Sequence, residues 1–392
     1  MNPCHVDITI VGGGIAGLWT LALAVKKGYH AILLEKEGLG AGQTLASQGI
    51  IHGGAKYALG ATITNATRVI TAMPGLWQQA HSGAGPIDLR HAIRLAEHQY
   101  LVPASGIDTQ LLSFLGSKSM SSHTETVRAK ELPEEYRQCG IQQSIFRLGE
   151  PVFDVRSVVE CFHRQFGERI FSAALQPGQV TESVEGVTLS LENGVRITSS
   201  HLVFAIGEGF AQLQRSTPPM QLRPLQMVMA QGKNLPAIYA HFIGRSTKPL
   251  LTITSHPCNG KGETVWYLGG GLAEDGVGKT AVEQIATARK LLGKLVPGIA
   301  RDESLQFSTY RINRAEPQQQ GLTRPDDAFV CRDGRIITGW PTKLALAPRF
   351  AEMVLNEITA APQPSAEKEL PSLPRPGIGH YPWQRLGGNA HA

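Results

Sequence analysis

The first forty residues combine apolar runs and glycines in an order that predicts a β-α-β unit. One apolar run covers residues 7–11 and ends at three glycines, a helical pattern spans residues 15–27, and a second apolar run over residues 31–34 ends at Glu35. In such a unit, Gly12 permits a tight turn, Gly14 lets the backbone approach a phosphate, and Gly17 lets the helix pack closely on the strand. The helix amino terminus offers N–H donors to phosphates, and Glu35 is placed to accept ribose hydroxyls. The pattern therefore predicts a dinucleotide site.

The middle of the chain has a different pattern of apolar and polar residues. Between residues 222 and 271, short strand-like runs follow one another at close spacing, which predicts an antiparallel sheet. An amphipathic helix is expected over residues 282–295, followed by a strand over residues 304–313. Other patterns predict a helix over residues 61–82 that breaks at Pro74, strands at 89–95 and 99–102, a helix at 155–166, and a buried strand that ends at Gly207.

These elements predict an α/β fold, α+β overall, with a Rossmann-like nucleotide-binding domain interleaved with an antiparallel-sheet substrate domain. A chain of 392 residues is too long for one ordinary core. Residues 1–80, 150–215 and 311–360 are assigned to the nucleotide domain, and residues 81–149 and 216–310 to the substrate domain. The Pro-rich residues 361–392 are predicted to form an extended tail rather than a folded unit.

Charge and cysteine content limit the binding partners and the cellular compartment that we expect. The formal charge is +5, with basic residues dispersed along the chain, so nucleic acid is not an expected partner. A weakly basic surface is compatible with peripheral contact at the inner face of an anionic membrane.

The five cysteines include no C-x-x-C pair, which favours a reducing cytoplasm over a disulfide framework. The apolar stretch at residues 8–25 contains the glycine turn, so we expect neither a signal peptide nor a membrane span there. The histidines have no H-x-x-x-H or H-E-x-x-H spacing, and no metal site is expected.

A family resemblance is carried by the loop after Glu35. Residues 42–57 read GQTLASQGIIHGGAKY, and together with the glycine turn they resemble the flavin-dependent oxidoreductases of the D-amino acid oxidase superfamily. Residues 51–57 most resemble the glycerol-3-phosphate dehydrogenases, with the 2-hydroxyglutarate oxidases nearby. The resemblance spans residues 1 to about 360 and implies FAD, an interleaved two-domain fold, and a substrate held over the flavin by the second domain.

The resemblance also implies which residues hold the cofactor. The ADP half is assigned to Gly12, Gly14, Ile15, Ala16, Gly17, Glu35 and Lys36. The flavin's ribityl chain and ring edge are assigned to Gln43, Thr44, Ser47, Gln48 and Gly49. Val180 is expected near the adenine, and Ala205 and Gly207 in a second dinucleotide strand. The segment that closes on the flavin pyrimidine is assigned to Gly339, Trp340, Thr342, Lys343 and Leu344.

Oxidation of an alcohol or amine by a flavin needs a base for the O–H or N–H proton, and His52 is the candidate because histidine titrates near working pH. The alternatives for His52 are a hydrogen bond to the flavin, packing beneath it, or covalent attachment to it. Tyr57 is a candidate for orienting the substrate, with an ordinary half-buried tyrosine as the alternative. Trp340 is expected either to stack near the flavin or to pack in the core.

The candidates for binding an anionic substrate are Arg311, Lys343 and Lys56. Arg314 and Arg245 are expected to be solvated surface charges. The glycerol-3-phosphate dehydrogenases typically carry arginine before the tyrosine, where this chain has Lys56. Because lysine lacks the bidentate fork of arginine, the resemblance does not carry phosphate specificity with it.

The sequence therefore predicts an FAD-dependent oxidoreductase that oxidises a small anionic hydroxy acid, polyol phosphate or amino acid by hydride transfer to flavin N5. Oxygen and a quinone are the candidate electron acceptors. Two alternatives stay open from the residues alone: a nicotinamide-dependent dehydrogenase on a plain Rossmann fold, and a flavoprotein that acts mainly as a binding or assembly partner through its Pro-rich tail.

Overall fold

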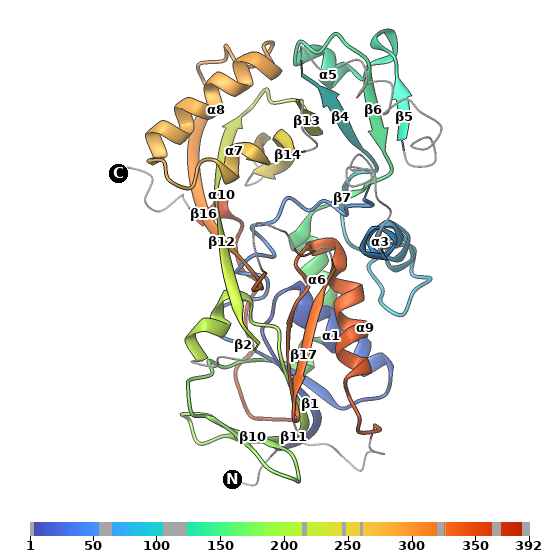
Figure 1. The fold of residues 1–392 in the computed structure, drawn as a ribbon, viewed down its shortest axis with the longest axis vertical. Helices are drawn as coiled ribbons and strands as arrows, with labels where there is room; N and C mark the ends of the chain where they lie inside the picture. The colour runs from blue at the N-terminus through green and yellow to red at the C-terminus, as the bar shows by residue number, and fades with distance from the viewer. Residues whose placement is uncertain are drawn as a thin grey trace.

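The chain folds into two lobes, one below the other in Figure 1, which are joined by the long strands β12 (Met220–Gly232) and β16 (Gln306–Pro317). The computed structural model describes residues 4–54, 65–104, 124–213, 218–244, 248–258, 262–319, 325, 327–362 and 370–385. Within these residues, the helices lack the combined length and hydropathy that crossing a bilayer requires.

The lower lobe is built on an eight-stranded sheet whose main path runs β17-β18-β11-β1-β2-β8. Its strands β18, β11, β1, β2 and β8 are parallel to their neighbours on this path, whereas β17 pairs antiparallel with β18, and β10 and β9 extend from β11 as antiparallel strands. The strands are β1 (Cys4–Val11), β2 (Ala31–Glu35), β8 (Ile170–Ser172), β9 (Val180–Glu182), β10 (Val187–Ser190), β11 (Arg196–Phe204), β17 (Phe329–Asp333) and β18 (Ile336–Trp340). The buried strand predicted to end at Gly207 is β11, which ends at Phe204 and lies beside β1.

Three helices pack on one face of this sheet because their apolar positions repeat at helical spacing. They are α1 (Ile15–Lys26), α6 (Val155–Phe166) and α9 (Ala347–Asn356). Helix α1 is buried along most of its length, as its uniformly apolar sequence requires. Asp154 accepts a hydrogen bond from the backbone N–H of Ser157 and so fixes the start of α6.

The upper lobe is a second eight-stranded sheet in the order β16-β12-β15-β14-β13-β4-β6-β5. Its pairs are antiparallel except for β13 with β4. The remaining strands are β4 (Gln99–Pro103), β5 (Thr124–Val127), β6 (Ile145–Leu148), β13 (Tyr239–Ile243), β14 (Pro249–Cys258) and β15 (Glu263–Gly269). Helices α5 (Glu134–Gln138), α7 (Gly271–Glu274) and α8 (Ala281–Leu295) belong to this lobe.

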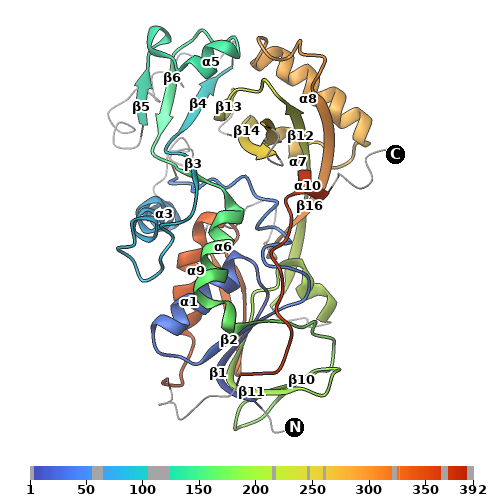
Figure 2. The ribbon, with the colours of Figure 1, turned by 180° about the vertical axis from the view of Figure 1, so that it is seen from behind.

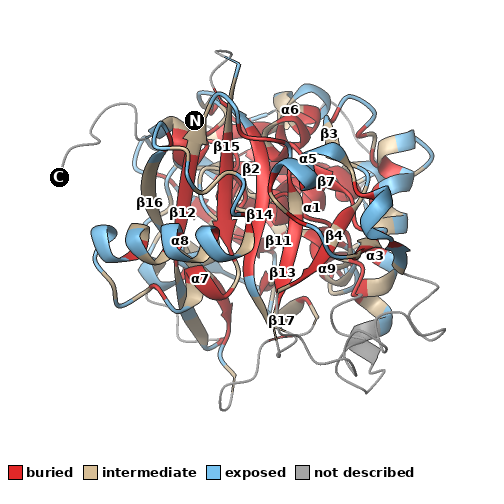
Figure 3. Ribbon diagram, turned by 90° about the horizontal axis from the view of Figure 1, so that it is seen from above, coloured by how far each residue is buried: buried red, intermediate tan, exposed pale blue. Residues whose placement is uncertain are grey.

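Successive side chains of β12 point to opposite faces of this sheet. Val228 and Ala230 join the core under α8, whereas Met227 and Met229 join a second cluster on the opposite face. Figure 3 shows the outer side of α8 exposed, with buried sheet strands behind it. A capping box between Thr280 and Glu283 sets the start of α8.

Strand β16 crosses the domain boundary that the sequence predicts. It pairs with β12 without interruption from Gln306 to Pro317, so residues 311–317 belong to the antiparallel sheet. The strand therefore continues across the predicted boundary at residue 311, and Ala315 near its end packs in the core of the lower sheet. The sheet pairing of a strand depends on its partner, which local periodicity does not reveal.

Two local predictions are also wrong. Helix α3 (Asn65–Ser82) continues through Pro74, whose ring lies against Gly53, and Trp77 one turn later is buried with its indole N–H donating to the Ala345 carbonyl. Tertiary packing outweighs the loss of one helical hydrogen bond. The strand predicted at 89–95 is reduced to β3 (Arg94–Ala96), which pairs with β7 (Val152–Phe153).

Residues 370–385 of the Pro-rich segment pack against the body of the protein, whereas composition predicted an extended tail. Residues 370–385 run from the lower lobe up to α10 (Pro382–Arg385), which Figure 2 shows beside β16. Leu39 and Ile378 form a parallel bridge, and Arg375 donates to three backbone carbonyls at residues 167–170. Tyr381 and Trp383 are buried in the cluster that contains Met227. We call residues 370–385 the C-terminal strap.

Candidate active site

A cavity of about 630 Å³ runs from the glycine turn of the lower lobe to the inner face of the upper sheet. At its first end, Gly12 and Gly17 occupy positions where a side chain would overlap neighbouring backbone atoms. Gly12 has φ +111°, and a Cβ there would overlap the Ala205 carbonyl. A Cβ on Gly17 would overlap the Gly12 carbonyl, so helix α1 can approach the turn only without a side chain at residue 17. This is the close approach that the glycine spacing predicts.

The amino terminus of α1 adjoins this end of the cavity. Its N-cap, Gly14, provides no side-chain cap, and Thr44 Oγ1 accepts from the backbone N–H of Ile15 at 2.9 Å. Glu35 also lines the cavity, and its two carboxylate oxygens accept from the N–H groups of Gly13 at 2.6 Å and Glu37 at 2.9 Å. Lys36 lies at the rim and pairs with Glu37 at 3.4 Å. A side-chain-free turn, a helix amino terminus and an acid on β2 fit the pyrophosphate and ribose of FAD.

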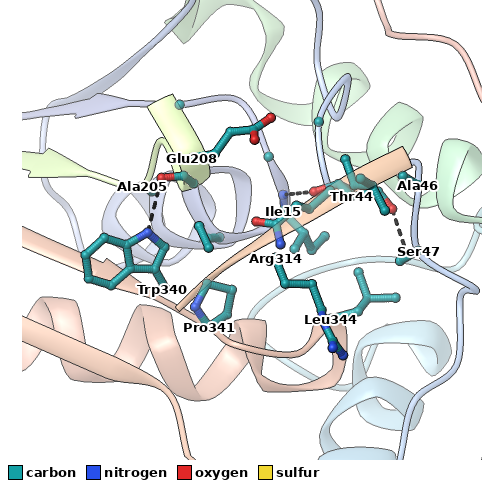
Figure 4. A pocket seen from close by; sticks show the side chains of 18 of the residues that line it. Ile15, Thr44, Ala46, Ser47, Ala205, Glu208, Arg314, Trp340, Pro341 and Leu344 are labelled. Atoms are coloured by element: carbon teal, nitrogen blue, oxygen red, sulfur yellow. Dashed lines mark hydrogen bonds between the residues drawn. The ribbon is translucent and has the colours of Figure 1, made fainter. Parts of the chain in front are cut away.

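The loop at residues 41–49 forms the next part of the wall (Figure 4). Ser47 Oγ donates to the Thr44 carbonyl at 2.7 Å and keeps the loop compact. Gln48 Nε2 donates to the Tyr267 carbonyl at 2.9 Å and thereby ties the loop to the upper sheet. Gly49 has φ +72° and lies so close to Phe153 that a Cβ would overlap its carbonyl. The cavity is lined by Gln43, Thr44, Ser47, Gln48 and Gly49, as well as by Gly12, Gly14, Ile15 and Ala16.

The opposite wall comes from the carboxyl-terminal part of the lower sheet. Trp340 is buried, and its indole N–H donates to the Gly207 carbonyl at 3.2 Å (Figure 4). The ring packs edge-on against Phe210 and stacks on Phe329, so Trp340 is a core residue whose edge reaches the cavity. Thr342 has φ +60°, an uncommon conformation for a β-branched residue. The cavity is lined here by Ala205, Gly207, Gly339, Trp340, Thr342, Lys343 and Leu344.

Three sequence-predicted residues, Gly17, Val180 and Arg311, do not line this cavity. Val180 begins β9, at the far side of the sheet extension, whereas Ala173 and Leu175 after β8 do line the cavity. Arg311 is exposed, and its guanidinium donates to the Lys279 carbonyl at 3.1 Å. Lys56, Tyr57 and Arg245 lie outside the described residues.

Arg314, which was expected to be a solvated surface charge, lines the cavity, whereas Arg311 does not. The two residues are three apart on β16, and successive side chains of a strand point to opposite faces, so only one of them can face the cavity. Arg314 lines it, with its side chain 27% exposed, and Figure 4 shows it extending towards Leu344. The alternation along β16 would have distinguished the two arginines if the register of the strand had been known.

Arg314 belongs to a charged group at the second end of the cavity. Glu274 lies between Arg314 at 3.4 Å and Lys248 at 3.1 Å, and all three side chains line the cavity. Lys248 also contacts Asp275 at 3.0 Å. Partial burial disfavours the charged amine, but hydrogen bonds to Asp275 and Glu274 outweigh it and raise the pKa of Lys248. Neither Lys248 nor Glu274 lies in a motif that singles it out in the sequence.

His52 lies at the same end, where the two lobes meet. Its Nδ1 is 3.1 Å from Glu150 Oε2, and its ring stacks on His241 of β13 with 5.6 Å between centroids. His52 and His241 line the cavity, whereas Glu150 lies behind them. The candidate ligand atoms of the three residues lie within 4.8 Å of one another, a grouping that sequence spacing does not show because the residues are far apart in the chain.

Comparison with known proteins agrees with this architecture. Residues 7–339 match the family model described as DAO, FAD dependent oxidoreductase. A probable FAD-dependent oxidoreductase of Pseudomonas aeruginosa, PA4991, is 41% identical over 385 residues, which cover 96% of this chain and 97% of the relative. The crystal structure of PA4991 superposes with a TM-score of 0.84 and 36% identity, covering 99% of each chain.

More distant structures share the fold. L-α-glycerophosphate oxidase from Mycoplasma pneumoniae, solved with FAD bound, has a TM-score of 0.67 at 13% identity, covering 94% of this chain and 98% of that one. Glycine oxidase from Geobacillus kaustophilus has a TM-score of 0.66 at 12% identity, covering 91% and 95%. The nicotinamide-dependent alternative is therefore wrong. The glycine turn, the loop at residues 41–49 and the match over residues 7–339 identify the chain as a member of the DAO family of FAD-dependent oxidoreductases, enzymes with FAD as their cofactor.

Proposed function

We propose that the enzyme oxidises a small carboxylic acid at a carbon that bears a hydroxyl or an amino group. The observation that carries this proposal is the placement of Arg314 in the same cavity as His52. One side chain supplies a guanidinium for an acid group, and the other supplies a ring nitrogen for a proton. When bound, FAD supplies the two-electron acceptor for such an oxidation.

Arg314 suits a carboxylate because its guanidinium presents paired N–H donors in a plane. It lies on strand β16, whose backbone pairs with β12 along its whole length, rather than on a loop. Its partial burial, with 27% of the side chain exposed, strengthens a charged hydrogen bond relative to the same bond in water. A charged hydrogen bond of this kind contributes about 1.5–3 kcal/mol.

The charges of Lys248 and Glu274 indicate which classes of acid suit the site. Glu274 lies between the two cations, so a bound carboxylate competes with Glu274 for Arg314, and Glu274 stays paired with Lys248. A substrate that also carries an amino group offers Glu274 a new cationic partner. This arrangement supports amino acids and hydroxy acids over polyol phosphates, which is consistent with the lysine at residue 56 in place of the arginine typical of the dehydrogenases.

His52 is proposed to accept the O–H or N–H proton of the substrate as its C–H bond is broken. The imidazole is 18% exposed at the cavity wall and close to Gly53, whose lack of a side chain admits Pro74 of α3. Such a base contributes about 10²–10⁴-fold to the rate.

Lys343, whose Nζ lies 3.5 Å from the Pro325 carbonyl, is proposed to favour negative charge near the flavin pyrimidine. The reoxidising partner is proposed to be oxygen or a quinone.

An anaerobic screen of the purified FAD-loaded enzyme tests this proposal. Both enantiomers of small 2-hydroxy and 2-amino acids, with glycerol 3-phosphate for comparison, are added in turn, and loss of the oxidised flavin absorbance is recorded. Carboxylic acids are expected to bleach the flavin and glycerol 3-phosphate is not. Bleaching by glycerol 3-phosphate alone, or by none of the acids when dithionite reduces the flavin normally, contradicts the proposal. Oxygen uptake and reduction of a soluble quinone by the reduced enzyme then separate the two acceptors.

A further inference from the structure

Glu150 is held against the loop of His52 by a short stretch of paired backbone. The Ile51 N–H donates to the Pro151 carbonyl, the Phe153 N–H donates to the Gly49 carbonyl, and Ile50 and Val152 form an antiparallel bridge. These contacts place residue 150 beside residues 52 and 53, although about a hundred positions separate them in the chain. The backbone pairing therefore holds the main chains of Glu150 and His52 in a fixed relative position.

The carboxylate of Glu150 has both oxygens engaged. Oε1 accepts from the backbone N–H of Gly53 at 2.8 Å, and Oε2 lies 3.1 Å from His52 Nδ1. The side chain is 3% exposed. A buried carboxylate is stable only with such donors, because an unpaired charge would carry a large desolvation cost. An ionised carboxylate can only accept hydrogen bonds, so the ring nitrogen that faces it must carry a proton.

This arrangement determines which nitrogen of His52 is basic. A neutral imidazole has one N–H and one lone-pair nitrogen, so a proton on Nδ1 leaves Nε2 as the acceptor. We propose that Glu150 is a positioning residue that holds His52 as the Nδ1-protonated tautomer and so presents Nε2 as the base. The inference rests on the proposed function, in which His52 accepts the substrate proton. The proton taken up at Nε2 gives an imidazolium whose charge the carboxylate of Glu150 stabilises.

Within the described part of the chain, a second titratable group packed against His52 is His241. Its ring stacks on that of His52 at an interplanar angle of 24°, and its Nδ1 lies 2.8 Å from Thr252 Oγ1 of β14. Two stacked imidazolium ions would repel each other, so protonation of His52 favours the neutral form of His241. Lys248, Glu274 and Arg314 line the same cavity and add charges to it. Glu150 differs from all of these because it is the carboxylate bonded directly to the His52 ring.

A first test measures the tautomer without any substrate. Long-range ¹H–¹⁵N NMR of the FAD-loaded, ¹⁵N-histidine-labelled enzyme distinguishes a protonated Nδ1 from a protonated Nε2, and a His52→Asn sample assigns the signal. The wild type is expected to show His52 protonated at Nδ1. A neutral His52 protonated at Nε2 would overturn the inference, whatever the activity of any variant.

The variant Glu150→Gln tests the role of the carboxylate with little change of shape. One of its two terminal positions becomes an NH₂ donor, which must face either the Gly53 N–H or His52 Nδ1. Since two donors cannot pair, the amide is expected to turn its NH₂ to Nδ1 and force the proton of His52 to Nε2. The titration midpoint of His52 should fall by about 1 pH unit, and anaerobic flavin reduction by the fastest acid of the screen should slow about 100-fold.

Glu97→Gln is the matched control, because Glu97 is exposed and pairs with Arg94 at the surface. It should leave the NMR signal of His52 and the rate unchanged. An unaltered tautomer and rate in Glu150→Gln would overturn the inference. If the tautomer changes in Glu150→Gln but His52→Asn reduces flavin as fast as wild type, Glu150 positions His52 and the proposed base is wrong. Activity that is lost on dialysis against EDTA and restored by Zn²⁺ would instead make Glu150 a metal ligand and overturn the positioning role.

Discussion

The two ends of the cavity are built in different ways. The end that contains the glycine turn is formed largely by one continuous piece of chain, residues 11–49, in which several glycines lie where a side chain cannot fit. The substrate end is assembled from side chains of separate segments, with His52 in a loop, His241 on β13, Lys248 next to β14 and Arg314 on β16. The first end depends on local backbone geometry, and the second on how two sheets are paired. Substitutions should therefore affect them differently.

The largest effect is expected from Gly17→Ala. Because a Cβ on Gly17 would overlap the Gly12 carbonyl and approach Leu33, the turn and α1 must separate, at a cost of about 3 kcal/mol. The purified variant is expected to retain little or no FAD, as measured by the ratio of flavin to protein absorbance. Gly42→Ala is the control, since Gly42 lines the same cavity and nothing lies within 4 Å of its Cβ position. Equal flavin content in the two variants would show that the close approach at Gly17 is unimportant.

Arg314→Met is expected to have the next largest effect, confined to the substrate end. Loss of the guanidinium should lower kcat/KM for the best acid by about 100-fold, equivalent to about 3 kcal/mol, while flavin content stays at the wild-type level. Arg311→Met removes the same charge from the other face of β16 and should change kcat/KM less than twofold, in line with other exposed charges. The comparison fails if Arg311→Met impairs the enzyme as much as Arg314→Met does.

Trp383→Ala tests the C-terminal strap, which contacts both lobes. Trp383 stacks on Tyr381 at 4.4 Å and lies 4.8 Å from the ring of His256, and it is 5% exposed. Its removal should lower the free energy of unfolding by about 3 kcal/mol, as measured by urea denaturation of the FAD-loaded protein. Leu370→Ala, at a residue that is 37% exposed, should cost less than about 0.5 kcal/mol. A loss no larger than that of Leu370→Ala would mean that the strap contributes little to stability.

The smallest effect concerns pH. Burial lowers the pKa of His256 to about 3, and burial together with Arg332 and Arg335 lowers the pKa of His201 to about 4. Both groups are neutral in the folded protein at neutral pH, whereas in the unfolded chain they take up a proton near the ordinary histidine pKa of 6.5. The free energy of unfolding should therefore fall as the pH drops below about 6.5, towards the folded pKa values, by about 1 kcal/mol per pH unit for each histidine.

His256→Gln should reduce this slope between pH 6.5 and 5, even though it lowers stability at neutral pH. Urea denaturation of the wild type and the variant across that range measures the difference. An identical pH dependence in both proteins would contradict the buried, neutral state of His256.

The sequence predicts the first end of the cavity well because the requirements there are local. Gly12, Gly17 and Glu35 follow one another at fixed spacing within one β-α-β unit, and each has a steric or hydrogen-bonding reason visible in the residue type. Helices α1, α6 and α8 are likewise confirmed, because the spacing of apolar residues along a helix is a local signal.

The second end is poorly predicted because its residues meet only through the fold. Choosing between Arg311 and Arg314 requires the register of β16 against β12, and the pairing of Glu150 with His52 requires the contact between residues 49–51 and 151–153. The C-terminal strap shows the same limit, since its composition favours an extended chain but Tyr381 and Trp383 find an apolar surface made by the upper sheet. Tertiary contacts that join distant segments have no counterpart in local periodicity.

The most direct test of the proposed substrate site compares one compound in two charge states. The fastest carboxylic acid of the anaerobic screen and its methyl ester are each mixed with the FAD-loaded enzyme, and the rate of flavin reduction is measured at subsaturating concentration. If Arg314 binds the acid group, the acid should reduce the flavin about 100-fold faster than the ester, and this ratio should collapse in Arg314→Met. Equal rates for the acid and the ester in the wild-type enzyme would contradict the account.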